Sequence, residues 1–133
     1  MATRPTEYWR ESVAEEARQV AAGELDAEDA STAELFPEDM LIRTDEVLQP
    51  FERELAALID PTDEEIFAVI QHVVLALNKV NEDYDGAAYE TDEREQLCEY
   101  IENSLTDNGI DVDAFAGRHG LTRHEITDEW RDW

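Results

Sequence analysis

The segment from Thr62 to Val80 most constrains the fold, because it combines a helix start signal with a broad apolar stripe. Thr62 and Glu65 have the spacing of a capping box, in which hydroxyl and carboxylate each satisfy a backbone amide at the helix start. Apolar residues then recur at helical spacing. They are Ile66, Val69, Ile70, Val73, Val74, Leu77 and Val80. So broad a stripe predicts a central core helix.

Two helices are expected before this segment. The first begins near Pro5 or Thr6, since proline is tolerated in a first turn, and it ends at Gly23. Its apolar stripe consists of Trp9, Val13, Ala17 and Val20. The second spans residues 44–59, with a break or kink at Pro50. The acidic stretch between them is expected to be a loop with a short helical turn over 30–35, and the apolar residues of 35–42 are expected to form a docking strip or a short extended segment.

Further helices are expected after the central one. Residues 81–90 are predicted to be a loop, Thr91 to cap the next helix, and 111–118 to form a short helix. The inner face of the helix after Thr91 consists of Leu97, Cys98, Ile101 and Leu105. A second capping box over 122–125 opens a last helix that is expected to run to residue 130.

These patterns predict an all-α fold, a compact bundle of five or six helices. No segment alternates apolar and polar residues over five or more positions, as a half-buried strand would. The chain has 133 residues, of which 42% are hydrophobic, and a chain of this length buries enough surface for a core. A single acidic helical domain over residues 1–133 is therefore expected.

The charge balance points to the kind of partner. Asp and Glu number 35 against 10 Lys and Arg, which gives a formal net charge of -25. A folded surface this negative repels nucleic acids and anionic membranes and attracts cations and basic proteins. An alternative interpretation is that the acidity serves solubility or salt adaptation in an accessory protein, in which case it implies no partner.

Several functional classes are not expected from this sequence. The longest apolar stretches are interrupted by Gln71 and His72, well short of the roughly 20 residues of a membrane span. The first ten residues lack the apolar run of a secretory signal, so a cytoplasmic protein is predicted. Cys98 is the single cysteine and is expected to pack in the core. The sequence has no phosphate loop, no nucleophile motif and no organised metal set, so it predicts a non-enzymatic protein without a cofactor.

The segment from Asn81 to Asp92 is similar to the calcium loop of an EF-hand. Oxygen ligands would come from Asn81, Asp83, Asp85 and Asp92, with Gly86 at the sharp turn. The pattern departs from an EF-hand at the uncharged first ligand, at the small residue in position eight and at the short carboxylate in position twelve. A calcium-binding helix–loop–helix module is thus one alternative function, and an acidic connection with a glycine turn is the other interpretation.

Residues 115–126 look like a helix-turn-helix, in which Arg123 and His124 would open the recognition helix. DNA binding requires phosphate neutralisation by Lys and Arg, whereas residues 111–133 carry six acids against three arginines. Two helices packed around a glycine turn explain the same pattern. Nucleic acid is therefore not an expected partner. His119 and His124 are poorly spaced for a zinc site on one helix face.

Residues 76–82, ALNKVNE, and 89–101, YETDEREQLCEYI, resemble a helix–loop–helix of small acidic bacterial immunity proteins. Such proteins are the partners of polymorphic or contact-dependent toxins. The resemblance is confined to residues 76–101 and implies toxin neutralisation.

The leading hypothesis is a binding protein that neutralises a basic protein partner, most concretely an immunity protein that blocks a toxin domain, including a nuclease domain. An acidic protein would occupy a basic cleft as a phosphate mimic, and complementary charge would speed association. Acids of the loop and first turn are expected to point outward and bind this partner, with two tyrosines as aromatic anchors. The acids are Glu82, Asp83, Asp85, Glu90, Asp92 and Glu93, and the tyrosines are Tyr84 and Tyr89.

Overall fold

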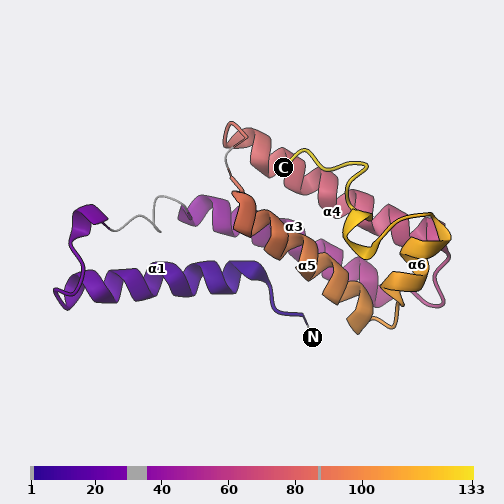
Figure 1. Cartoon of the computed structure of the whole chain (residues 1–133), viewed down its shortest axis with the longest axis horizontal. Coiled ribbons are helices and arrows are strands. Elements are labelled where there is room, and N and C mark those ends of the chain that lie inside the picture. Colours follow the sequence, from indigo (N-terminus) through magenta and orange to yellow (C-terminus); the bar gives the residue numbers. More distant parts are fainter. Residues whose placement is uncertain (1, 30–35, 87) are drawn as a thin grey trace.

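The computed structural model describes residues 2–29, 36–86 and 88–133, and five α-helices make up most of this part of the chain (Figure 1). They are α1 (Pro5–Ala21), α3 (Glu38–Ala57), α4 (Asp63–Asp83), α5 (Thr91–Asp107) and α6 (Val112–Arg118). Two short 3-10 helices, η1 (Ala27–Asp29) and η2 (Arg123–Glu125), complete the described elements. The described residues contain no strand, so the all-α prediction is confirmed.

Helix α4 forms the centre of the fold, as its sequence predicts. Its capping box is present, since the Glu65 amide donates to Thr62 Oγ1 at 3.2 Å and the Thr62 amide donates to Glu65 Oε1 at 3.3 Å. The whole predicted stripe is buried. The helix continues to Asp83, three residues into the predicted loop. Asn81 is buried there, and its Oδ1 accepts the Ala88 amide at 3.0 Å, which ties the following loop to the helix.

Helix α3 begins at Glu38, earlier than predicted. The expected extended segment is wrong over residues 38–42, which are helical. The apolar residues of the expected docking strip that the structure describes do pack into the core, where Met40 and Leu41 are fully buried. The start has a physical reason, because Pro37 is the extended residue before the helix and two acids, Glu38 and Asp39, follow in its first turn, where they favour the positive helix end.

The predicted break at Pro50 is also wrong, because α3 continues through this residue to Ala57. Pro50 and Glu46, whose carbonyl loses its helical donor, are both exposed, so water can satisfy that carbonyl. The opposite face of the helix buries Leu48 and Phe51. Burial of this face outweighs the local cost of the proline.

Helix α1 contacts the other helices mainly through its first half. Trp9 is buried and its ring stacks on Phe36, with centroids 5.4 Å apart. Of the remaining predicted stripe, Val13 packs against the core but Ala17 is exposed. The second half of α1 extends past the ends of the other helices in Figure 1. The helical turn predicted over 30–35 lies outside the described residues.

Helix α5 has the predicted inner face, with Leu97, Ile101 and Leu105 fully buried. Its N-cap is Glu90, not Thr91, which is the first helical residue and makes no capping bond. Cys98 is half-buried at the edge of this face. The helix therefore presents one side to the core and leaves the adjacent side for the C-terminal segment.

The C-terminal segment departs most from the prediction. A single 3-10 turn, η2, is followed by turns over 126–130, so the predicted last helix is wrong. Asn78 of α4 explains this, because its Nδ2 donates to the Trp130 carbonyl at 2.6 Å and its Oδ1 accepts the Asp132 amide at 2.9 Å. These bonds hold the backbone against α4, and Ile126 and Thr127 of the same segment are buried.

Candidate functional site

Exposed carboxylates gather where α3 begins, α4 ends and α5 begins, at one end of the bundle (Figure 1). Four of the predicted partner-binding acids lie here with exposed side chains. We call Glu82, Asp85, Glu90 and Asp92 the acidic end. Within the described residues, none of the four carboxylates makes an ion pair or a side-chain hydrogen bond. Their negative charge is therefore not neutralised inside the protein.

Asp83 is exposed at the same place, but its carboxylate is already paired. Arg43 Nη2 lies 2.6 Å from Oδ2, and Lys79 Nζ lies 3.0 Å from Oδ1. The hydrogen bonds from Lys79 and then Arg43 lower the pKa of Asp83. Asp83 thus joins α3 to α4, and its charge is less available to a partner than the sequence predicts.

Tyr89 is not an exposed anchor, and its prediction as one is wrong. Its side chain is only 2% exposed, and its ring lies 6.2 Å from Trp9 and 5.9 Å from Trp133. Its hydroxyl is hydrogen-bonded to Thr44 Oγ1 at 2.8 Å, and burial raises its pKa to about 12. Aromatic packing across three segments explains the burial. Tyr84 is half-buried against the core and keeps part of its ring at the surface.

Glu93 also departs from the prediction, because it is buried with only 4% exposure. Its Oε1 has no hydrogen-bond partner, and burial raises the pKa of the carboxyl. Successive residues of a helix point about 100° apart, so Asp92 faces solvent while its neighbour faces inward. Acids of one first turn cannot all point outward together.

The candidate calcium ligands do not converge. Asn81 uses its side-chain oxygen to hold the Ala88 amide, and Asp83 faces two cations. Asp85 lies in a turn with a φ of 59°, and Asp92 belongs to α5. Across the part of the chain that the structure describes, no three His, Cys, Asp or Glu side chains are grouped as a metal site requires.

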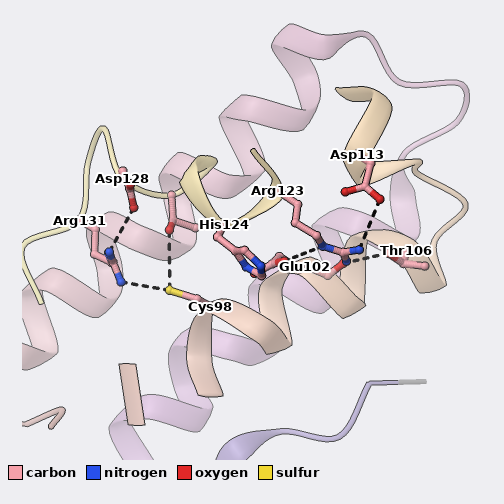
Figure 2. Close-up of polar contacts among 9 residues, drawn as sticks. Cys98, Glu102, Thr106, Asp113, Arg123, His124, Asp128 and Arg131 are labelled. Carbon is pink, nitrogen blue, oxygen red and sulfur yellow. Dashed lines mark hydrogen bonds and ion pairs between the residues drawn. The ribbon is translucent and has the colours of Figure 1, made fainter. Parts of the chain in front are cut away.

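A groove of about 810 Å³ lies between α5 and the C-terminal segment. Figure 2 shows the polar side chains that meet across it. From α5 it is lined by Arg94, Glu95, Cys98, Glu99 and Glu102, and from the C-terminal segment by Arg123, His124 and Arg131. Three of the ten basic residues thus face one groove of a very acidic protein. We call this feature the groove.

The first level of contact across the groove is centred on Glu102, whose side chain is 5% exposed. Arg123 Nε donates to its Oε1 at 2.8 Å, and His124 Nδ1 lies 3.2 Å from its Oε2 (Figure 2). Arg123 Nη1 also lies 3.7 Å from Asp113. Arg123 and His124, which would open the recognition helix of a helix-turn-helix, therefore hold η2 against α5.

The second level is centred on Cys98, one turn earlier on α5. Arg131 Nη1 donates to the sulfur at 3.2 Å (Figure 2), and Thr127 Oγ1 lies 3.8 Å from it. Arg131 Nη2 donates to Asp128 Oδ1 at 3.1 Å. Burial raises the pKa of the thiol, although the nearby guanidinium acts in the opposite direction. The thiol form is thus favoured over the reactive thiolate.

The other two histidines pair with carboxylates of neighbouring helices. His72 is exposed on α4, with Nδ1 3.0 Å from Glu54 of α3. His119 Nε2 lies 2.9 Å from Asp63, which Arg118 also contacts through two nitrogens. The hydrogen bonds from Arg118 and His119 lower the pKa of Asp63 to about 2. These contacts fix α3 and α6 to α4.

The groove is the feature that sequence reasoning missed. Its two walls come from segments more than twenty residues apart, as the Arg123–Glu102 pair shows. One signal was present in the sequence, because Arg94, Cys98 and Glu102 recur at four-residue spacing, which places them on one helix face. Nothing in that spacing indicates what lies opposite.

No family model, curated protein or solved structure matches this chain. The resemblance of residues 76–101 to immunity proteins therefore stays a prediction from the sequence. None of the helices in the described part of the chain is both long and apolar enough to cross a membrane.

Proposed function

We propose that this protein is a non-enzymatic acidic binding protein that neutralises a basic protein partner, most concretely as an immunity protein that blocks a toxin domain. The observation that carries the proposal is the acidic end, whose four exposed carboxylates have no cationic partner among the described residues. By contrast, Asp63, Asp83 and Glu102 are each contacted by basic side chains.

The proposed mechanism is occlusion of a basic surface. The acidic end would meet Lys and Arg of the partner, and long-range attraction would accelerate the encounter. The exposed part of the Tyr84 ring, next to Asp85, would supply apolar contact area. Because these side chains make no ion pair that must first be broken, their engagement would leave the fold unchanged.

The test begins with capture of partners from lysate of the source organism on immobilised protein, at low and at moderate salt, with identification by mass spectrometry. We expect one dominant basic protein that is retained at moderate salt. A diffuse set of basic proteins that all dissociate at moderate salt would contradict the proposal and favour an acidity that serves solubility or salt adaptation.

Two isosteric double variants then test the location. Glu82→Gln/Glu90→Gln removes two charges from the acidic end, whereas Glu64→Gln/Glu129→Gln removes two exposed charges elsewhere. We expect the first pair to weaken binding of the captured partner and the second pair to change it much less. Equal weakening would mean that total charge matters and that the acidic end is not the interface.

A further inference from the structure

The C-terminal segment contacts two successive turns of α5 in the groove, at Glu102 and Cys98. The turn of α5 before them is left open, and we call it the open level. On α5, Glu102 is contacted by Arg123 and Cys98 is contacted by Arg131. The next position on the same face, one turn earlier, is Arg94. The chain does not reach it, because the Asp132 amide bonds to α4 and the segment turns back into the core.

Arg94 is half-buried at this position, and its guanidinium makes no hydrogen bond or ion pair within the described part of the chain. Its Nε is buried without a hydrogen bond, a state that is rare in proteins because an unsatisfied buried donor costs free energy. Glu90 lies four residues earlier, in the favourable order for a helical ion pair, yet no pair between them forms in the structure. Arg53 likewise makes no hydrogen bond or ion pair among the described residues, but it is exposed on α3.

The chemistry that fits this position is a single carboxylate. A guanidinium binds a planar carboxylate through two parallel hydrogen bonds. The exposed neighbours Glu95 and Glu99 line the same groove, and a dianion such as phosphate would be repelled by them and by the net charge of -25. The same two acids favour positive charge on either side of the bound carboxylate.

We propose that the Arg94 end of the groove binds an acidic side chain, flanked by basic ones, on an extended segment of a protein partner. The lining of the groove on α5 extends from Thr91 to Asn103, about 18 Å at the rise of a helix. An elongated groove with its open part at the Arg94 end suits a peptide segment better than a small molecule. The inference rests on the proposed function only in taking the partner to be basic.

The experiment is a titration of the isotopically labelled protein with two blocked tripeptides, acetyl-KEK-amide and acetyl-KQK-amide, followed by NMR chemical shifts. General attraction to an acidic protein favours KQK, which carries one more positive charge. The proposed site favours KEK instead, by about fivefold, with shifts concentrated on α5 between Thr91 and Asn103. Tighter binding of KQK, or shifts located elsewhere, would overturn the proposal.

Three variants locate the effect. Arg94→Gln should remove the preference for KEK, and Arg94→Lys should retain only part of it, because lysine keeps the charge but not the planar fork. Arg53→Gln, which removes an exposed arginine outside the groove, should leave the preference unchanged. Thermal unfolding of each variant verifies that it is folded. An unchanged preference in folded Arg94→Gln would refute the site, while the acidic end would still be judged by the Glu82 and Glu90 variants.

Discussion

The acidic end and the groove use the same residue type in opposite ways. Glu82 and Glu90 are exposed and have no cationic partner in the described structure, whereas Glu102 is buried between Arg123 and His124. A carboxylate in the first setting is solvated and contributes repulsion to the fold, and in the second it holds two segments together. The position of a carboxylate relative to the few cations therefore decides its role.

The scarce cations mostly join segments that are distant in sequence. Arg4 contacts Glu52 through two nitrogens and links the start of α1 to α3. Arg118 makes a similar contact with Asp63 between α6 and α4. Because these contacts leave the acidic end unneutralised, we infer that its charge serves binding rather than folding.

The largest expected effect comes from neutralising the buried carboxylate. Glu102→Gln replaces a charge that faces two basic side chains, and we expect it to lower the free energy of unfolding by about 2 kcal/mol. Urea denaturation measures this change. The matched control is Glu99→Gln, an exposed acid on the same helix, which should stay within about 0.5 kcal/mol of the wild type.

Similar changes in unfolding free energy for the two variants would contradict the difference between buried and exposed carboxylates. Equal and small losses for Glu102→Gln and Glu99→Gln would mean that the contacts of Arg123 and His124 do not stabilise the C-terminal segment. The groove would then be no better organised than the acidic end.

A smaller effect is expected where the aromatic core meets the acidic end. Tyr89→Phe removes the hydroxyl that bonds Thr44 Oγ1 and should cost about 1 kcal/mol of unfolding free energy. Tyr84→Phe is the control, since the Tyr84 hydroxyl makes no side-chain hydrogen bond with the described residues. If Tyr89→Phe instead weakened partner binding without changing stability, Tyr89 would be a binding anchor after all.

Asp63 is a half-buried, paired carboxylate whose setting is intermediate between those of the acidic end and of Glu102. The folded-state pKa of Asp63, about 2, lies below its ordinary value of 3.8. The stability that its contacts with Arg118 and His119 contribute is therefore complete above the ordinary pKa and is lost as pH falls toward 2. Thermal melts of wild type and Asp63→Asn should converge between about pH 5 and about pH 2. A constant difference across this window would contradict the assigned role.

The smallest effect is expected at the acidic end itself. Glu82→Gln/Glu90→Gln removes two unpaired charges from a surface with strong self-repulsion, so stability should stay within about 0.5 kcal/mol of the wild type or rise slightly. Urea denaturation at low salt checks this directly. A clear loss of stability would show that these carboxylates support the fold, and the contrast with Glu102 would no longer hold.

The sequence predicts much of the fold because several helices carry complete local signals. The apolar stripe and the capping box specify α4. At the start of α6, the Asp111 side chain accepts the Ala114 amide and caps the helix. The predicted helix boundaries are wrong where tertiary contacts, rather than local sequence, determine the backbone conformation. Pro50 sits inside α3 because the buried face around Phe51 outweighs its local cost, and Asn78 holds the residues after η2 in turns.

The site is predicted less well for the same reason. Charge and composition locate Glu82 and Asp92 at an acidic surface, but only the folded arrangement separates them from buried Glu93 and Tyr89. The groove depends on Arg131 reaching Cys98 across 33 residues of sequence. No local pattern encodes such a contact, and without matching homologues no covariation reveals it.

We propose that the acidic end, rather than the overall charge, engages the partner. The most direct measurement is the association rate of the captured partner with wild type, Glu82→Gln/Glu90→Gln and Glu64→Gln/Glu129→Gln, each at low and moderate salt. We predict that the first variant slows association by about threefold at low salt and that the second stays close to wild type, with the difference shrinking as salt screens the charges. Equal slowing by both variants would contradict the claim and assign the attraction to net charge alone.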